Sequence, residues 1–259
     1  MRPSSEIVYG LHPVLEMLRS GRRIGKLYLS LNKAEKEGEE IRTLARQQKI
    51  SIALVHKEAL SQLAGTANHQ GVAAIIDAPS SQDLDDLLAV SKKRSSPPFF
   101  FLLDSVEDPR NLGAILRTAE AAGVHGVIIP KRRAAGLSPV VGKTSAGAMA
   151  HLPIARVTNI SQAIDRLKKE QISIVGMDGT AKISYLETNF REAVAIVVGG
   201  EGSGIHHKIL ERCDQVVSLP MHGMVASLNV SVAAGIVAYE VLRQRGGMAV
   251  SKHTRPLGV

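Results

Sequence analysis

The segment FFFLLDSVEDPRNLGAILRTAEAAGVHGVIIP, residues 99–130, contains the pattern that decides the fold. A continuous apolar run ends at Asp104, which is typical of a strand buried on both faces. Asp108 then offers an N-cap directly before a proline, so we expect a helix over residues 109–122. A second apolar run follows at residues 124–130. A strand, a helix and a strand in this order predict a parallel βαβ unit.

The same alternation continues along the rest of the chain. Further strands are expected at residues 172–177, 193–199 and 215–219, and further helices at residues 160–170, 207–212 and 228–245. Apolar strands that are separated by helices indicate a parallel sheet covered on both faces. The predicted fold class is therefore α/β with a parallel sheet.

The first part of the chain predicts a smaller α/β unit. Its expected helices are residues 10–19 and 34–48, and its expected strands are residues 26–30, 51–55 and 72–76. Prolines and serines then gather around a short predicted helix at 84–91, as is typical of a linker. We expect four regions, namely a small domain at 1–78, a linker at 79–98, a larger domain at 99–246 and a basic tail at 247–259.

The composition indicates a polyanionic partner. The chain has 259 residues and a net charge of +8, which favours nucleic acid, although a basic surface also occurs on proteins that bind none. It has no Trp, four Tyr and four Phe, which is a poor supply of rings for stacking single-stranded bases. An RNA partner would therefore be recognised mainly through shape and phosphate contacts.

Other classes of protein are disfavoured. Cys213 is the only cysteine, which excludes an intramolecular disulfide and a multi-cysteine zinc site and fits a reducing cytosol. No histidine pair has the spacing of metal ligands, so no metal is expected. No apolar run reaches the ~18 residues of a membrane span, and the first twenty residues lack a signal peptide pattern. We expect a cytoplasmic protein without a membrane partner.

Two segments place polar or glycine residues where predicted strands end. The first, residues 104–123, carries Asn111 and Arg117 at or near the carboxyl edge of the sheet, where open α/β sheets bind ligands. Both could equally be surface residues of an ordinary crossover helix. The second, VVGGEGSG at residues 197–204, has glycines around Glu201 that allow close backbone approach to a ligand. The Glu201 carboxylate argues against a phosphate cradle.

The third segment, PMHGMVASLNVSVAAGIVAYE at residues 220–240, crowds Ser227, Asn229 and Ser231 at a helix start. One of them could be a plain N-cap, but three are more than a cap requires. Two further patterns are weaker. LSPVVGKT at residues 137–144 resembles a phosphate-binding loop without its first glycine and does not follow a strand directly. The glycines of the second segment match only part of a dinucleotide fingerprint.

In this order and spacing, the three segments resemble the signature motifs of the SpoU (TrmH) family of S-adenosylmethionine-dependent RNA 2′-O-ribose methyltransferases. The first motif corresponds to residues 108–113 with Arg117, the second to residues 199–204 with Glu201, and the third to residues 227–231. The resemblance covers the region from about residue 99 to residue 245.

The amino-terminal part is similar to the small substrate-binding domain of one branch of this family, which methylates a guanosine of 23S ribosomal RNA. YGLHP at residues 9–13 and HQGV at residues 69–72 carry this similarity. There are two alternatives. One is a tRNA 2′-O-methyltransferase, and the other is a non-catalytic RNA-binding or ribosome-assembly protein that keeps the fold.

The resemblance implies a parallel sheet with a carboxyl-terminal trefoil knot of the SPOUT type, preceded by a small α/β domain of the L30e-like type. It also implies a homodimer that holds S-adenosylmethionine in the knot and acts on structured ribosomal RNA. The residues implied for the cofactor are Gly199, Leu219, Met221 and Leu228. The residues implied for catalysis are Asn111, Arg117, Glu201, Ser227 and Asn229.

Arg117 has two alternative roles. The family assigns this position as the base that takes the proton of the ribose hydroxyl. An arginine side chain holds its proton very strongly, which makes that role demanding. Arg117 could instead position the adjacent phosphate and stabilise the developing alkoxide charge, while Asn111, Glu201 and Asn229 fix the geometry of in-line attack.

Overall fold

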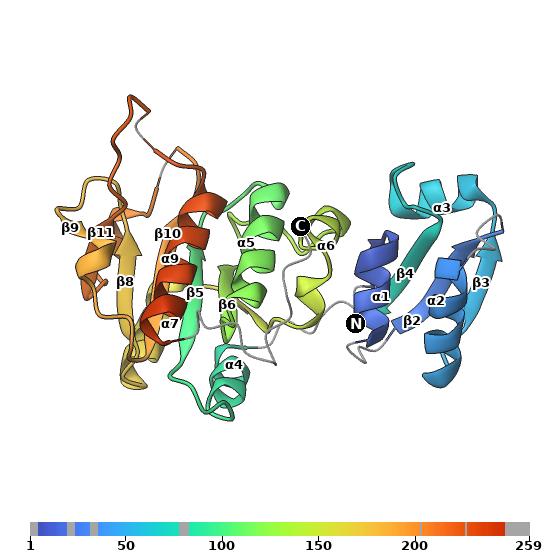
Figure 1. The fold of residues 1–259 in the computed structure, drawn as a ribbon, viewed down its shortest axis with the longest axis horizontal. Coiled ribbons are helices and arrows are strands. Elements are labelled where there is room, and N and C mark those ends of the chain that lie inside the picture. The colour runs from blue at the N-terminus through green and yellow to red at the C-terminus, as the bar shows by residue number, and fades with distance from the viewer. Residues whose placement is uncertain are drawn as a thin grey trace.

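Two α/β units lie next to each other, each with its own sheet (Figure 1). The structure is a computed structural model, and it describes residues 5–19, 24–31, 36–77, 83–202, 204–225 and 227–246. The predicted tail at 247–259 and the start of the predicted linker, up to residue 82, lie outside the described residues.

The amino-terminal unit has a four-stranded sheet in the order β1-β4-β2-β3. Its strands are β1 (Ser5–Tyr9), β2 (Ile24–Ser30), β3 (Ile52–Val55) and β4 (Val72–Asp77), and its helices are α1 (Leu11–Arg19), α2 (Lys36–Gln47) and α3 (Lys57–Ala64). Helices α1 and α2 cover one face, and α3 covers the other through Leu60 and Ala64. The strand β1 and the helix α3 were not predicted, whereas the other elements match the expected ranges.

The carboxyl-terminal unit confirms the predicted parallel α/β sheet. Its seven strands have the order β7-β6-β5-β10-β8-β11-β9, and every pair is parallel. The strands are β5 (Phe99–Asp104), β6 (Gly126–Pro130), β7 (Ile154–Val157), β8 (Ser173–Met177), β9 (Ile183–Ser184), β10 (Val194–Gly199) and β11 (Gln215–Ser218). The edge strands β7 and β9 were not predicted. The trefoil knot stays a prediction.

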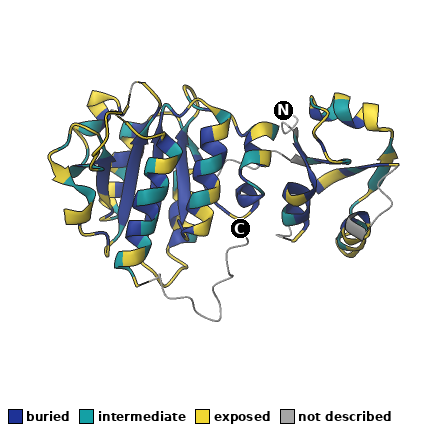
Figure 2. Cartoon of the chain, turned by 45° about the horizontal axis from the view of Figure 1, so that its top comes forward, coloured by how far each residue is buried: buried dark blue, intermediate teal, exposed yellow. Residues whose placement is uncertain are grey.

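Helices cover both faces of this sheet, so the central strands are buried between them (Figure 2). One face carries α5 (Pro109–Ala121), α6 (Pro139–Thr144) and α9 (Val230–Gln244). The other carries α4 (Leu84–Ser91), α7 (Ile160–Lys169) and α8 (His207–Leu210). The residues of β5 alternate between the two cores, with Phe101 facing the first and Phe100 facing the second. This explains the continuous apolar run in its sequence.

The short helix expected in the linker packs on the carboxyl-terminal sheet. Leu87 and Leu88 of α4 are buried in the same core as Phe100. Arg245 beyond α9 reinforces this part of the chain, because its guanidinium donates hydrogen bonds to the carbonyls of Pro97 and Pro98.

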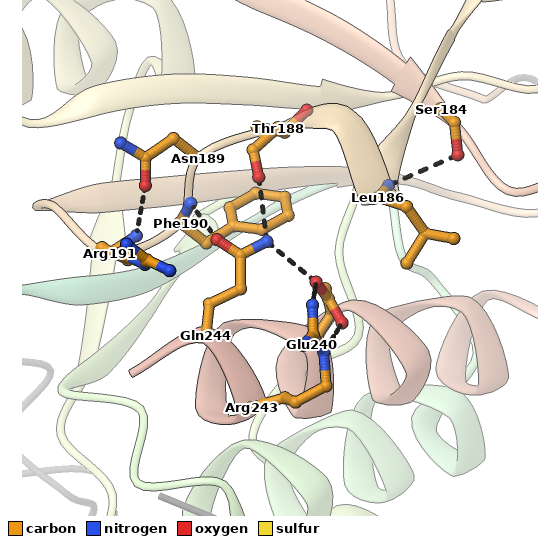
Figure 3. A network of polar contacts seen from close by, with 9 residues as sticks. All are labelled: Ser184, Leu186, Thr188, Asn189, Phe190, Arg191, Glu240, Arg243 and Gln244. Atoms are coloured by element: carbon orange, nitrogen blue, oxygen red, sulfur yellow. Dashed lines mark hydrogen bonds and ion pairs between the residues drawn. The ribbon is translucent and has the colours of Figure 1, made fainter. Parts of the chain in front are cut away.

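A polar network anchors the end of α9 (Figure 3). The buried Glu240 carboxylate accepts hydrogen bonds from Arg243 at 2.8 and 2.7 Å, and these lower the pKa of Glu240. Gln244 also donates to Glu240, and it joins the helix to the segment before β10 through the Thr188 carbonyl and the Phe190 amide. The carboxyl end of α9 is therefore held, which helps to place its other end, where the third motif lies.

The segment 137–144 does not form a phosphate-binding loop. It forms α6, whose N-cap Ser138 follows a connection that leaves β6 at Pro130. Gly142 faces Val8 of the amino-terminal unit, and α6 together with the turn η1 (Ala148–Ala150) makes the contact between the two units. This pattern of residues therefore serves packing between the units.

Candidate active site

Three predicted catalytic residues form one hydrogen-bonded cluster, which we call the amide–carboxylate cluster. Asn111 Nδ2 donates to Glu201 Oε1 at 2.7 Å. Asn229 Nδ2 lies 3.0 Å from both Glu201 Oε1 and Asn111 Oδ1. The cluster joins residues that are 90 and 118 positions apart in the chain. The structure therefore brings one residue of each motif to a single place.

Sheet pairing explains why the first two motifs meet. Strands β5 and β10 are adjacent and parallel, with Asp104 opposite Gly199, so both motifs leave the sheet at its carboxyl edge. The Gly200 amide donates to the Asp104 carbonyl at 2.8 Å. A Cβ on Gly200 would lie 1.9 Å from the Ser105 carbonyl oxygen, and one on Gly199 would lie 2.0 Å from the Gly204 carbonyl carbon. Only glycine permits this close approach of backbones.

Asn229 is held in one orientation by the start of α9. It is the N-cap of this helix, and its Oδ1 accepts from the Ser231 amide at 2.9 Å and the Ser231 hydroxyl at 2.6 Å. Because its oxygen is occupied in this way, its Nδ2 is directed at Asn111 and Glu201. The residue that caps the helix thus also completes the cluster, and Ser231 supports it.

Two cavities meet at the cluster. The first, which we call the glycine-loop cavity, has a volume of about 430 Å³ and lies between the 199–204 loop and the residues Ser227, Leu228 and Asn229. The second, which we call the strand-end cavity, has a volume of about 370 Å³ and lies at the ends of the strands. Asn111 lines the second cavity, and Glu201 lines both. Each volume is within the range of small-ligand sites.

The glycine-loop cavity fits a cofactor that is held largely by backbone groups. From Met221 to Leu228, the described residues form no hydrogen bonds with the rest of the described chain. Their amides and carbonyls are therefore available to a ligand. Gly199 and Leu228 line this cavity. Leu219, which packs partly buried against the core, and the exposed Met221 are not among the residues that line it.

Arg117 is not part of the cluster. It lies on α5 six positions after Asn111, which corresponds to about 9 Å along the helix axis and a different helix face. Its side chain is exposed and has no hydrogen bond or ion pair with any residue that the structure describes. Ser227 is exposed as well, but it borders the glycine-loop cavity.

Sequence reasoning missed the contact between Asp104 and His206. The buried Asp104 carboxylate lies 2.8 Å from both the backbone amide and the Nδ1 atom of His206. His206 is the N-cap of α8, and it lines the strand-end cavity together with Arg133. An acidic residue at the end of an apolar strand was the available signal, because a buried carboxylate needs a donor.

Other reactive groups contribute no second site. Burial raises the pKa of the Cys213 thiol to about 11, so it is protonated at neutral pH. Within the described part of the chain, no group of three or more His, Cys, Asp and Glu side chains is placed to hold a metal ion. None of the described helices is both long and apolar enough to cross a membrane.

Known proteins share both units of this chain. Residues 98–239 match the model of the SpoU rRNA Methylase family, and residues 7–82 match a model described as RNA 2′-O ribose methyltransferase substrate binding. The TrmH family tRNA/rRNA methyltransferase YacO of Bacillus subtilis is 42% identical over 245 residues, which are 95% of this chain and 98% of that protein. A homologue of the same description from Staphylococcus haemolyticus is 40% identical over 92% of this chain and 96% of its own.

Solved structures share the fold. The SpoU methyltransferase AviRb from Streptomyces viridochromogenes, in complex with S-adenosylmethionine, has a TM-score of 0.82 and 26% identity, over 94% of this chain and 91% of its own. A crystal structure of an RNA 2′-O ribose methyltransferase has a TM-score of 0.76 and 28% identity, over 94% and 90%. The fold and the site define an S-adenosylmethionine-dependent methyltransferase. The chain belongs to the SpoU (TrmH) family, whose members are tRNA/rRNA methyltransferases.

Proposed function

We propose that this enzyme transfers the methyl group of S-adenosylmethionine to a ribose 2′-hydroxyl of ribosomal RNA, at a guanosine of the 23S molecule. The amide–carboxylate cluster carries this proposal, because it stands between a cofactor-sized cavity and a second polar cavity. The similarity of residues 9–13 and 69–72 to one family branch supports the choice of substrate, as does the net charge of +8. Because ribosomal RNA is the proposed substrate, we also propose a cytoplasmic location.

The glycine-loop cavity is the proposed cofactor site. Gly199 and Leu228 line it directly, and Leu219 and Met221 belong to the same carboxyl edge. When bound, S-adenosylmethionine supplies a methyl group on a positively charged sulfur. The Glu201 carboxylate lies at the edge of this cavity, where its negative charge favours a cation.

The strand-end cavity is the proposed position of the ribose. In-line attack requires the hydroxyl and the methyl group to approach along one axis. The amides of Asn111 and Asn229 and the Glu201 carboxylate are rigidly connected, so they can hold this axis at the boundary of the two cavities. Ser227 borders the cofactor side and is proposed to help place the reacting groups.

Arg117 is proposed to contact the phosphate next to the target ribose and to stabilise the developing alkoxide. Its exposure and its distance along α5 from Asn111 fit a group that binds RNA from outside the cluster. A guanidinium keeps its proton at neutral pH, which favours this role over that of a base. The homodimer, the trefoil knot and the division into domains at 1–78 and 99–246 belong to the same proposal.

A methylation assay tests the function. The protein is incubated with 23S ribosomal RNA, or with tRNA in parallel, and with S-adenosylmethionine labelled on its methyl group. We expect label in alkali-resistant linkages of the ribosomal RNA, since 2′-O-methylation blocks alkaline cleavage. Label found only on bases would contradict the 2′-hydroxyl, and label confined to tRNA would contradict the substrate.

Calorimetry separates this enzyme from a non-catalytic RNA-binding protein. An enzyme of this class binds S-adenosylmethionine saturably, whereas an assembly factor that merely keeps the fold would not. Absence of saturable binding would contradict catalysis.

A further inference from the structure

A third cavity lies where the two units meet, and we call it the inter-unit cavity. It has a volume of about 460 Å³. The amino-terminal unit contributes Ser30, Lys57 and the loop 67–71, and the carboxyl-terminal unit contributes Lys143 of α6. It therefore exists only when the two units are arranged as in this structure.

The charge of this cavity is positive. Its lining includes Lys57 and Lys143 and no Asp or Glu. Lys143 Nζ donates to the Asn68 carbonyl at 3.4 Å and lies 5.8 Å from the centre of the Tyr9 ring. Both partners are uncharged. Neither lysine forms an ion pair with a described residue, so no carboxylate of the described chain lies within 4.0 Å of either ammonium group.

The loop that faces the lysines is held in one conformation. His69 is fully buried, its Nδ1 accepts from the Gly71 amide at 3.0 Å, and its Nε2 lies 3.1 Å from the Ser61 hydroxyl. Burial lowers the pKa of His69, and the positive charge of Lys57 lowers it further. Gln70 adopts a left-handed backbone with φ +53°, and its Oε1 accepts from the Leu11 amide at 3.0 Å. The floor of the cavity is thus rigid before any ligand arrives.

We propose that the inter-unit cavity binds a backbone phosphate of the substrate RNA, held jointly by Lys57 and Lys143. The inference rests on the proposed function, because that function supplies the RNA. Two ammonium groups that form no ion pair with a described residue suit an anion. No Phe, Tyr or Trp lines the cavity for base stacking, and the ring of His69 is fully buried. The phosphate contact would bridge the two units on the RNA.

The position of Lys143 makes this bridge specific. Its helix α6 packs on the amino-terminal unit through Gly142 and Val8, and Ala150 of η1 is buried in that unit's core. The apolar contact between α6 and the amino-terminal unit therefore places Lys143 at the same cavity as Lys57 without a bound phosphate. A change of charge at either lysine should affect RNA binding without removing that contact.

Salt-dependent binding of 23S ribosomal RNA tests the proposal. We compare the wild-type protein with Lys57→Ala, Lys143→Ala and the double variant. The matched control is Lys93→Ala, which removes an exposed lysine just after α4, on the other side of the carboxyl-terminal sheet. Loss of one phosphate contact reduces the slope of log affinity against log salt by about 0.7–0.9.

We expect each single variant to weaken RNA binding roughly 3- to 10-fold at moderate salt and to lower the slope by about one contact. The affinity for S-adenosylmethionine and kcat at saturating RNA should stay at wild-type values. Lys143→Met keeps an aliphatic chain of similar length without the charge, so it should bind RNA as weakly as Lys143→Ala, whereas a purely structural role of the aliphatic chain would restore the binding.

Three outcomes would overturn the inference. They are an unchanged slope in the double variant, an equal effect of Lys93→Ala, and loss of cofactor binding together with RNA binding. The wild-type protein tests the proposed function separately. If it methylates ribosomal RNA while the double variant binds RNA normally, the cavity assignment alone is wrong. If the wild-type protein methylates no ribose, the proposed function fails.

Discussion

The polar side chains of the amide–carboxylate cluster bond to one another, whereas the charged side chains of the inter-unit cavity do not. In the cluster, Asn111, Glu201 and Asn229 bond to one another within 3.0 Å, so their geometry is fixed and their donors are directed. In the cavity, Lys57 and Lys143 form no ion pair with a described residue, and no Asp or Glu lines it. Fixed geometry suits a reaction axis, whereas unneutralised charge suits affinity for a polyanion. Under the two proposals, the chain carries out its chemistry and binds RNA at separate places.

The largest expected effect is at Arg117, which belongs to neither region. We expect Arg117→Ala to abolish methyl transfer while S-adenosylmethionine still binds, because Arg117 lies outside the glycine-loop cavity. Transfer is measured by single-turnover label incorporation and binding by calorimetry. Loss of cofactor binding would show that Arg117 is misplaced here. Glu120→Gln, an exposed change on the same helix, is the control.

A large but smaller effect is expected within the cluster. Glu201→Ala leaves the amides of Asn111 and Asn229 without their shared acceptor. We expect kcat to fall about 10²- to 10³-fold, as for misplaced reacting groups, with the salt slope of RNA binding unchanged. Rate and slope are measured on the same preparation. A change in the salt slope of RNA binding with an unchanged kcat would contradict the separation of catalysis in the cluster from RNA binding in the inter-unit cavity.

The backbone contact beneath the cluster gives a stability prediction. Gly200→Ala would place a Cβ 1.9 Å from the Ser105 carbonyl oxygen, so we expect a loss of about 3 kcal/mol in unfolding free energy and weaker cofactor binding. Gly136→Ala is the control, because a Cβ there meets nothing within 4 Å. Urea denaturation measures both. Equal stability of the two variants would contradict the close approach.

The smallest expected effect is the pH dependence of stability at His125. Burial, together with the positive charges of Arg94 and Arg245, lowers the pKa of His125 to about 4. Below pH 6.5, the ordinary pKa of histidine, His125 is protonated in the unfolded chain but stays neutral in the folded protein. The free energy of unfolding therefore falls as the pH drops from 6.5 towards 4. We expect a loss of about 1–2 kcal/mol from pH 7 to pH 5, allowing for solvent screening.

His125→Asn should remove this pH-dependent loss, because asparagine does not titrate. Its amide oxygen can still accept the hydrogen bond from the Phe99 amide that Nδ1 accepts in the wild-type protein. His12→Asn, at an exposed position of α1, should leave the loss unchanged. Urea denaturation at pH 7 and pH 5 is the measurement. A wild-type loss that persists in His125→Asn would assign the pH dependence to other groups.

Local patterns predicted the elements of the fold well where they are long and apolar or capped. Phe99–Asp104 and Leu84–Ser91 match their expected ranges, since an apolar run or a cap such as Asp83 acts within a few residues. The edge strand Ile154–Val157 was missed, although the equally short Gln215–Ser218 was predicted; the place of the missed strand in the sheet is set by its pairing with Gly126–Pro130. The helix Lys57–Ala64 was also missed, since its N-cap His56 forms no side-chain cap hydrogen bond.

For the site, the sequence by itself determined the three motifs, their order and their position at strand ends, because the periodicity, capping and glycine spacing that define them are local. Only the tertiary structure decided that Asn111, Glu201 and Asn229 bond to one another, that Arg117 stands apart, and that Lys57 of one unit faces the same cavity as Lys143 of the other. These relations join residues far apart in the chain, so they depend on strand register and on packing between helices and units, which no local pattern contains.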